Sequence, residues 1–316
     1  MHTTNYCERQ WSNIELPPEL WVPSMVGSDE RRLLFSLARD SFSGAGAIVD
    51  AGCFLGGSTL ALGAGLRANP GAGSQVALHA YDMFLLDDIM VKHYINPARD
   101  GLRKPGQSCR DLFDRNIAAI APMVHVHHGD IREIGWNGSP IEILFLDISK
   151  SPNINDRIVG DFFPALLPGR SVLVQQDYVH EAHFWIHITM ELLHEYFTYV
   201  EFVELSSTVY LLRKPIPRHI LDGCRWDALG DDDKFRLMDS AIGRWQGYPK
   251  GVLECCRALM RACFGDRDGA LGDLARIHDD YYWSDHVRTR AEWNRGLVLA
   301  EWQPQDTPTW RLAPGP

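Results

Sequence analysis

The sequence lacks several features that would assign it to a class of protein at once. It contains no run of about 18 apolar residues, so no segment is expected to span a membrane. Residues 1–11 include neither the basic stretch nor the apolar stretch of a signal peptide, and we therefore expect a soluble, cytoplasmic protein. Cysteine is scarce, with seven residues and no C-x-x-C pair, which disfavours a disulfide framework and a structural zinc site.

An excess of positive charge is also absent. The chain has 31 Lys and Arg residues against 41 Asp and Glu residues, for a net charge of −10. Without a basic stripe, little free energy of counterion release is available for holding DNA or RNA, so a nucleic-acid partner is not expected. A hydrophobic content of 45% and a charged content of 23% exclude a wholly disordered or fibrous chain. The length of 316 residues allows about two domains, or one core with additions.

Short apolar segments alternate with helical patterns between residues 28 and 214. The alternation predicts an α/β fold, with a Rossmann-like, doubly wound, mostly parallel seven-stranded sheet and a closing antiparallel hairpin. In such a sheet, ligands bind at the carboxyl ends of the strands. The expected parallel strands are 47–51, 75–82, 123–127, 141–147 and 171–177, and the expected hairpin strands are 199–205 and 208–214.

Outside this core, the chain divides at its prolines. Residues 1–27 are interpreted as an N-terminal arm, and residues 215–316 as a helical C-terminal extension with helices near 233–245, 251–264 and 285–302. The extension is expected to dimerise the chain or to cap a substrate site. Residues 83–106 lack a clean period, which is typical of a lid, a binding loop or a disordered segment.

A glycine-rich segment follows the first expected strand. Asp50 ends that strand, Gly52 and Gly56 follow it, and Ser58 and Thr59 can cap the next helix. No lysine follows as in a phosphate loop, and Phe54 interrupts the G-x-G-x-x-G pattern. An acid at this place repels a dinucleotide pyrophosphate and attracts an ammonium group. A tight turn without a ligand is the alternative.

With these residues, the segment resembles the first motif of class I S-adenosylmethionine-dependent methyltransferases. The resemblance covers about 28–214 and implies S-adenosyl-L-methionine as the cofactor. It also implies that the loop, with Asp50, Gly52, Gly56 and Ser58, holds the amino-acid end of that cofactor. Two acids after the next strands match further positions of the family. The resemblance implies that Asp82 binds the ribose hydroxyls and that Asp130 lies near the adenine edge. Each alone is more often a solvated acid at the end of a strand.

The end of the fourth strand narrows the resemblance. Asp147 and Lys150 form an Asp-x-x-Lys segment similar to that of the metal-dependent, catechol-type O-methyltransferases. The segment Gln176-Asp177-Tyr178 is similar to the one that completes the metal site in the catechol-type and macrocin-type enzymes. The resemblance implies Asp147 and Asp177 as ligands of Mg²⁺ or another divalent cation. Asp147 also adjoins the methyl donor, and Lys150 and His180 are candidate bases. Gln176 in place of a carboxylate weakens the expected site, so metal-assisted and metal-free chemistry both stay open.

Three histidines follow the fifth strand. His180, His183 and His187 are spaced to share one face of a helix, which more often lines a pocket or packs than binds metal. A zinc site with Asp177 is the alternative.

Taken together, the sequence predicts O-methylation of a hydroxyl on a small polar or natural-product acceptor, sugar-like or phenolic. The alternatives are a metal-independent N-methyltransferase of a small molecule and a non-catalytic cofactor-binding or assembly protein. The C-terminal helices are also candidates for contacts between copies in a homo-oligomer.

Overall fold

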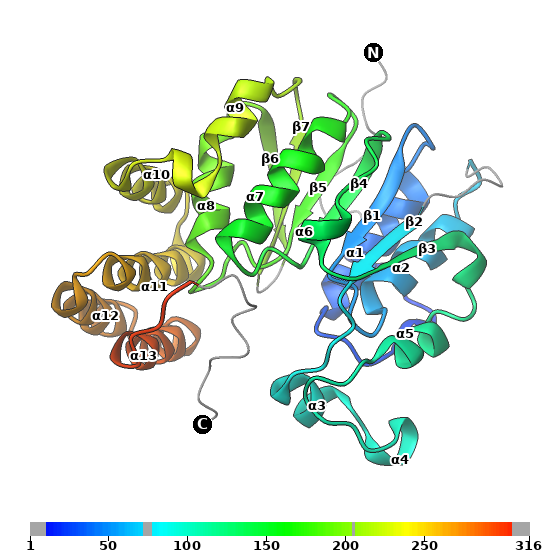
Figure 1. Ribbon diagram of the computed structural model, residues 1–316, viewed down its shortest axis with the longest axis horizontal. Coiled ribbons are helices and arrows are strands. Elements are labelled where there is room, and N and C mark those ends of the chain that lie inside the picture. Colours follow the sequence, from blue (N-terminus) through cyan, green and yellow to red (C-terminus); the bar gives the residue numbers. More distant parts are fainter. Residues whose placement is uncertain (1–10, 72–77, 204–205, 305–316) are drawn as a thin grey trace. The chain divides into compact units, whose positions relative to one another are not determined.

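The chain folds into two compact units that interleave along the sequence (Figure 1). The structure is a computed structural model, which describes residues 11–71, 78–203 and 206–304. The first unit, the sheet unit, comprises residues up to Ile148, Gly160–Gln176 and Tyr196–Ile216. The second, the helical unit, comprises Ser149–Val159, Asp177–Glu195 and the residues from Pro217 onward.

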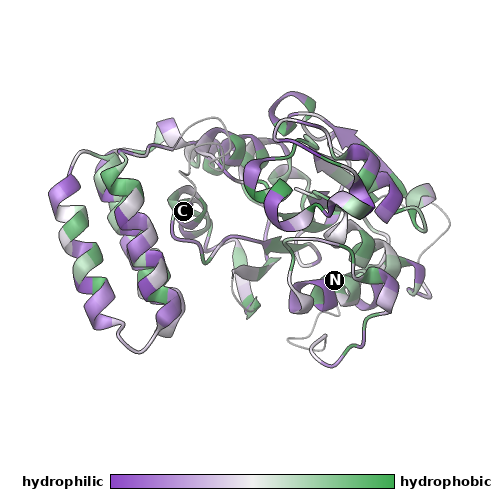
Figure 2. Ribbon diagram, turned by 90° about the horizontal axis from the view of Figure 1, so that it is seen from below, coloured by the Kyte–Doolittle hydropathy of each residue, from purple (hydrophilic) through white to green (hydrophobic). Residues whose placement is uncertain are grey.

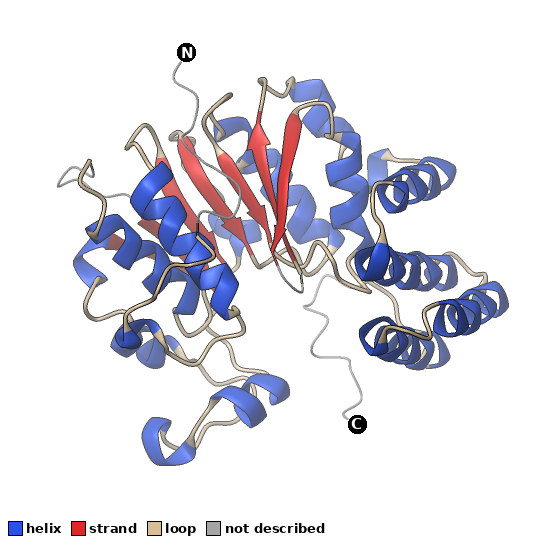
Figure 3. Ribbon diagram, turned by 180° about the vertical axis from the view of Figure 1, so that it is seen from behind, coloured by secondary structure: helices blue, strands red, loops and turns tan. Residues whose placement is uncertain are grey.

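A seven-stranded sheet forms the centre of the sheet unit, with the order β3-β2-β1-β4-β5-β7-β6 (Figure 3). Strands β1 to β5 are parallel, and β7 pairs antiparallel with both β5 and β6. The fold class expected from the sequence is therefore confirmed. Residues 75–77 and 204–205 of the expected strands lie outside the described residues. The strands are β1 (Ala47–Ala51), β2 (Leu78–Asp82), β3 (Val124–His128), β4 (Ile141–Leu146), β5 (Val172–Gln175), β6 (Phe197–Val203) and β7 (Ser207–Leu212).

The middle of the sheet is the most apolar part of this unit. Every residue of β1, β4 and β5 is buried, as the nearly continuous apolar runs in their sequences predict for strands covered on both faces. The carboxyl ends of β1, β2 and β4 carry the acids Asp50, Asp82 and Asp147. These three side chains thus start from one edge of the sheet, because neighbouring parallel strands end on the same side.

Helices of the sheet unit pack closely on one another and form part of its core. Helices α1 and α2 approach so closely that a Cβ on Gly65 would lie 2.2 Å from the carbonyl oxygen of Phe35. The helices of this unit are η1 (Pro18–Leu20), α1 (Ser28–Ser36), the π-helix η2 (Leu37–Ser41), α2 (Gly57–Arg67), α3 (Asp88–Tyr94), α4 (Pro97–Asp100), α5 (Arg110–Asn116), η3 (Ala121–Met123), α6 (Ile131–Ile134) and η4 (Phe163–Ala165).

The long connection after β2 is folded. It contains α3 and α4, and its two ends are joined by the hydrogen bond from the Leu86 amide to the Gln107 carbonyl, at 2.9 Å. Asp100 is buried inside it and pairs with Arg99 and Arg115. The expectation of a disordered segment is therefore wrong, while a lid or a binding loop stays a prediction.

The helical unit contains no strand among its described residues. Apolar and polar residues alternate along the helices at the C-terminal end of the chain (Figure 2), whereas Phe184–Glu191 of α8 are all buried. Cys255 and Cys256 of α11 are fully buried, as the apolar pattern around them predicts. The helices are α7 (Pro152–Asp161), which begins in this unit, α8 (Phe184–Leu192), α9 (Arg218–Gly223), η5 (Trp226–Ala228), α10 (Asp231–Gly243), α11 (Gly247–Cys263), α12 (Arg267–Asp280) and α13 (Asp285–Leu299).

Polar contacts hold α8 to the C-terminal helices inside this unit. Glu191 of α8 is buried and accepts hydrogen bonds from Arg244 and Ser240. Asn294 of α13 donates to the backbone carbonyls of Glu181 and Cys255. Among the described residues, no helix is both long and apolar enough to cross a membrane.

Candidate functional site

The glycine loop between β1 and α2 has a backbone that only glycine fits at its first bend. Gly52 has a φ of +101°, and a Cβ there would lie 2.3 Å from the carbonyl oxygen of Asp147. Its amide donates to the carbonyl of Tyr81 at 2.9 Å, which fixes the loop to the end of β2. Gly56, with a φ of +90°, is the N-cap of α2. The chain thus turns tightly at the carboxyl ends of β1 and β4.

Asp50 is fully buried beneath this loop. Its Oδ2 accepts hydrogen bonds from the hydroxyls of Ser58 at 2.9 Å and Thr59 at 2.5 Å. Its Oδ1 is buried and has no hydrogen-bond partner among the described residues. Burial raises the pKa of Asp50 to about 7, the two hydroxyls oppose this rise, and the charge of Asp82 adds to it.

Asp82 holds the loop from the neighbouring strand. Its two carboxylate oxygens accept hydrogen bonds from the backbone amides of Phe54, at 2.7 Å, and Phe84, at 2.6 Å. Both phenylalanines have left-handed backbones, with φ of +46° and +52°. Burial raises the pKa of Asp82, and these backbone hydrogen bonds oppose the rise. The Asp82 side chain therefore shapes two bends of the chain in addition to any ligand contact.

Asp130 lies after β3, at the start of α6. Its Oδ1 accepts a hydrogen bond from the backbone amide of Arg132 at 2.9 Å, as an N-cap does. The Arg132 guanidinium also pairs with the carboxylate at 2.6 Å, and this hydrogen-bonded pair lowers the pKa of Asp130. The predicted contact with an adenine edge would share this carboxylate with Arg132.

Asp147 follows β4 and lies close to the glycine loop. Its amide donates to the carbonyl of Ala51 at 2.8 Å, and its side chain is partly exposed. Tyr94, at the end of α3, is a neighbour that the sequence alone did not place there. Burial raises the pKa of Tyr94, and the charges of Asp147 and Asp87 raise it further. The Tyr94 ring packs edge-on against Phe54, with centroids 5.6 Å apart.

A second group of predicted residues gathers in the helical unit. Asp177 has a left-handed backbone, with a φ of +61°, and its Oδ2 pairs with the ammonium of Lys150. Burial raises the pKa of Asp177, but the charges of Lys150, His180 and His183 outweigh it, so that the pKa lies well below its usual range. The two histidine rings stack, with centroids 3.9 Å apart and planes 7° from parallel.

His183 is the most deeply buried member of this group. Only 2% of the residue is exposed, and its Nδ1 has no hydrogen-bond partner among the described residues. Burial, together with the charge of His180, holds the pKa of His183 well below its ordinary value. Burial thus favours the neutral form of this imidazole.

The expected helical face of three histidines is wrong. Helix α8 begins at Phe184, so His180 and His183 lie in the loop before it, and His187 lies inside it. His187 is buried and its Nε2 bonds to the Tyr178 carbonyl. His187 therefore has a packing role, whereas the other two imidazoles gather beside Asp177.

The predicted ligand pair of Asp147 and Asp177 is divided between the units. Asp147 belongs to the sheet unit and Asp177 to the helical unit, and their joint metal site stays a prediction. Gln176, the neighbour that departs from the family pattern, donates from its Nε2 to the Ser206 hydroxyl at 3.3 Å.

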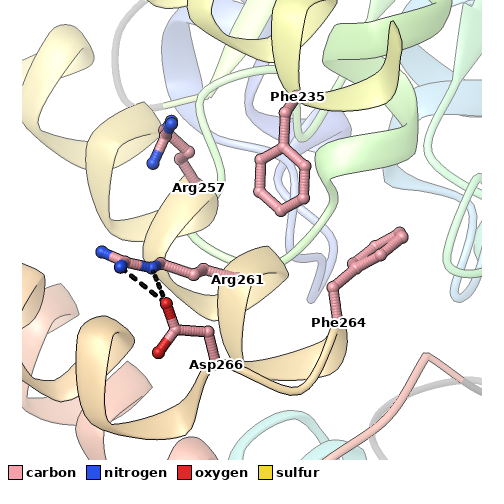
Figure 4. Close-up of a pocket in the computed structure, with 5 residues that line it drawn as sticks. All are labelled: Phe235, Arg257, Arg261, Phe264 and Asp266. Atoms are coloured by element: carbon pink, nitrogen blue, oxygen red, sulfur yellow. Dashed lines mark hydrogen bonds and ion pairs between the residues drawn. The ribbon is translucent and has the colours of Figure 1, made fainter. Parts of the chain in front are cut away.

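A separate cavity of about 240 Å³ lies in the helical unit (Figure 4). Its lining combines aromatic and charged side chains, but Arg261 is paired with Asp266 and Asp273, and Arg257 with Asp239. None of the residues predicted from the sequence lines it. The lining residues are Phe235, Arg257, Arg261, Phe264 and Asp266.

Part of the chain is similar to solved structures that include two methyltransferases. A candidate O-methyltransferase from Klebsiella pneumoniae is 16% identical, with a TM-score of 0.43 over 64% of this chain and 93% of that one. The calicheamicin methyltransferase CalS11 is 13% identical, with a TM-score of 0.39 over 58% of this chain and 76% of that one. The pyocyanin biosynthetic protein PhzM is 16% identical, with a TM-score of 0.36 over 57% of this chain and 54% of that one.

The sequence matches no protein-family model and no curated protein.

Proposed function

We propose that the chain is an S-adenosylmethionine-dependent methyltransferase. The observation that carries the proposal is the loop between β1 and α2, where left-handed glycines turn above the buried Asp50 and the Asp82 carboxylate binds the loop backbone. Acids at three neighbouring strand ends suit a ligand that brings a cation and hydroxyl groups, and they disfavour a pyrophosphate. The unpartnered Oδ1 of Asp50 is a buried acceptor that a ligand donor would satisfy.

The proposed cofactor contacts follow the resemblance residue by residue. Asp50, Gly52, Gly56 and Ser58 form the loop for the amino-acid end, and Asp82 is the acceptor for the ribose hydroxyls. Each oxygen of Asp82 uses one lone pair for a backbone amide, which leaves acceptor capacity for a hydroxyl. When bound, the cofactor supplies an electrophilic methyl group on a sulfonium.

We further propose that the acceptor is a hydroxyl of a small polar molecule. In the transfer, a C–O bond forms as the C–S bond breaks, and the hydroxyl proton passes to a base. Lys150 and His180 are the candidate bases and both lie beside Asp177, and Lys150 can accept the proton only after its own ammonium has lost one. Asp147 and Asp177 are the proposed carboxylates for a divalent ion that would polarise the acceptor oxygen.

A metal-independent methyl transfer is the second candidate. It is favoured by the ion pair between Lys150 and Asp177, because an ammonium already balances the carboxylate that the metal would use. Gln176 in place of an acid supports the same alternative. Methyl transfer that survives chelation by EDTA would favour this candidate over the metal-assisted one.

Isothermal titration calorimetry with S-adenosylmethionine and S-adenosylhomocysteine tests the core of the proposal. We expect one molecule of either ligand to bind per chain. The absence of heat and of any change in thermal stability at millimolar ligand would overturn it. Transfer of a labelled methyl group to sugar-like or phenolic acceptors then tests catalysis separately from binding.

A further inference from the structure

We propose that Asp177, His180 and His183 form a binding site for a divalent transition-metal ion, with Zn²⁺ as its probe, rather than for Mg²⁺. All three residues belong to the helical unit and lie in one loop between β5 and α8. Each offers one ligand atom, and these atoms lie within 4.8 Å of one another. The proposal concerns metal binding alone and does not rest on methyl transfer.

The spacing of the group suits a small ion. The His183 Nδ1 lies 3.6 Å from the Asp177 Oδ2. In a tetrahedral site with metal–nitrogen distances of about 2.1 Å, neighbouring ligand atoms are about 3.4 Å apart. One pair is thus close to ligating distance, and the other pairs, which lie within 4.8 Å, need the side chains to move closer together.

The buried imidazole of His183 points to a missing partner. Its Nδ1 has no hydrogen-bond partner among the described residues, although only 2% of His183 is exposed. Buried polar atoms are nearly always bonded, and an unbonded one indicates an ion or a water molecule. The nearby Asp177 carboxylate makes a cation the better partner.

His180 completes the set from the more exposed side. Its ring stacks on that of His183, and its Nδ1 accepts a hydrogen bond from the Ala182 amide at 3.1 Å. That nitrogen therefore already presents a lone pair, and a metal ion at Nδ1 would replace the amide as its partner. With 28% of its side chain exposed, His180 gives the ion access from solvent.

Lys150 occupies the place of a cation in this group. Its ammonium pairs with Asp177 Oδ2, the same oxygen that faces His183. A metal ion at this oxygen and the ammonium therefore compete. This competition makes metal affinity depend on a residue that is not itself a ligand.

The ligand types select the ion. Mg²⁺ prefers oxygen ligands in octahedral geometry, whereas two imidazoles and a carboxylate suit Zn²⁺ and Fe²⁺ and leave coordination positions open. If the proposed function also holds, His180 would be engaged as a ligand, and Lys150 would remain as the candidate base. This last consequence alone depends on the proposed function.

The test is metal titration of the full chain after stripping with a chelator. We expect one Zn²⁺ per chain by calorimetry and elemental analysis, and visible Co²⁺ absorption typical of imidazole ligation. Excess Mg²⁺ should not displace either ion. His180→Ala and Asp177→Asn should weaken Zn²⁺ binding by about 100-fold or more, since even residues that only support a ligand cost 10–100-fold.

Two further variants separate the proposal from misfolding. His219→Ala removes an exposed histidine of the same unit and should leave Zn²⁺ affinity unchanged. Lys150→Met removes the competing ammonium and should tighten Zn²⁺ binding by about 10-fold, a gain that misfolding does not produce. The proposal is overturned if no Zn²⁺ binds, or if the affinity is unaffected by His180→Ala or by Lys150→Met. S-adenosylmethionine binding, measured on the same chains, reports on the proposed function independently.

Discussion

Asp50 is an acid whose charge is unfavourable in the folded chain. It is fully buried, two hydroxyls share one of its oxygens, and its other oxygen has no partner among the described residues. Burial therefore raises its pKa from 3.8 to about 7. The folded state holds a proton on Asp50 that the unfolded state releases between about pH 4 and pH 7. This residue should consequently make the protein less stable as the pH rises through that range.

Replacing Asp50 with Asn should remove this pH dependence. The amide is neutral at every pH, as the protonated acid is, so the variant should lack the loss of stability that the wild type shows between pH 4 and pH 7. The difference between the two chains should change by about 3 kcal/mol across this range. Urea unfolding of both at pH 4.5 and pH 8 measures it. Parallel pH profiles would show that Asp50 is charged at little cost in the folded chain.

Asp82 is the residue on which cofactor affinity should depend most clearly. Asp82→Ala removes the proposed ribose acceptor and also the acceptor for the Phe54 and Phe84 amides. We expect S-adenosylmethionine binding to weaken by about 1–3 kcal/mol, the effect of losing a charge-assisted hydrogen-bond partner. Asp88→Ala, which removes an exposed acid of the nearby α3, is the matched control for net charge. Calorimetric affinities that are equal for the two variants would contradict the role of Asp82.

At the scale of elements, the loop between β1 and α2 depends on space as well as on backbone angles. Gly44 and Gly52 both have positive φ, but a Cβ on Gly44 meets nothing within 4 Å, while one on Gly52 would lie 2.3 Å from the Asp147 carbonyl oxygen. Gly44→Ala should cost about 1–2 kcal/mol through its backbone alone. Gly52→Ala should cost about 1–3 kcal/mol more, because β1 and the end of β4 must separate. Denaturant unfolding measures the free energy of unfolding of both variants. Equal losses of stability would mean that the backbone moves to relieve the contact between the new Cβ and the Asp147 carbonyl at no cost.

The central strands could be predicted from the sequence because strands that are buried on both faces consist mostly of apolar residues. Ile141–Leu146 forms β4 where a nearly continuous apolar run, interrupted by Glu142, ends at Asp147, and β1 has the expected bounds. The connections could not be predicted in the same way. Helices α3 and α4 are short and mostly exposed, and the ion pair between Arg115 and the buried Asp100 joins residues 15 positions apart. The loop that brings His180 and His183 beside Asp177 depends on the left-handed backbone conformation of Asp177. The pattern of side chains in the sequence does not predict that conformation.

For the whole molecule, the sequence suggested a contiguous core at 28–214 followed by an extension. Two stretches inside that range, Ser149–Val159 and Asp177–Glu195, instead belong to the compact unit of the C-terminal helices. They contain Lys150 and Asp177, so candidate catalytic residues depend on packing supplied by the end of the chain. A linear pattern of strands and helices cannot reveal such interleaving, because the contacts that define it are long-range.

A chain that ends at residue 214 should therefore fail to keep α8 folded. It lacks Arg244 and Ser240, so the buried Glu191 carboxylate would lose these hydrogen-bond donors. It also lacks Cys256, whose thiol contacts His187. An uncompensated buried charge and an uncovered apolar helix are each strongly destabilising. Hydrogen exchange measures this directly: amides of Phe184–Leu192 should be protected in the full chain and exchange rapidly in the truncated one. A chain ending at residue 304 is the control and should keep the protection. If the 214-residue chain protected α8 equally, residues 28–214 would form an independent domain, and the C-terminal helices would be a separable addition.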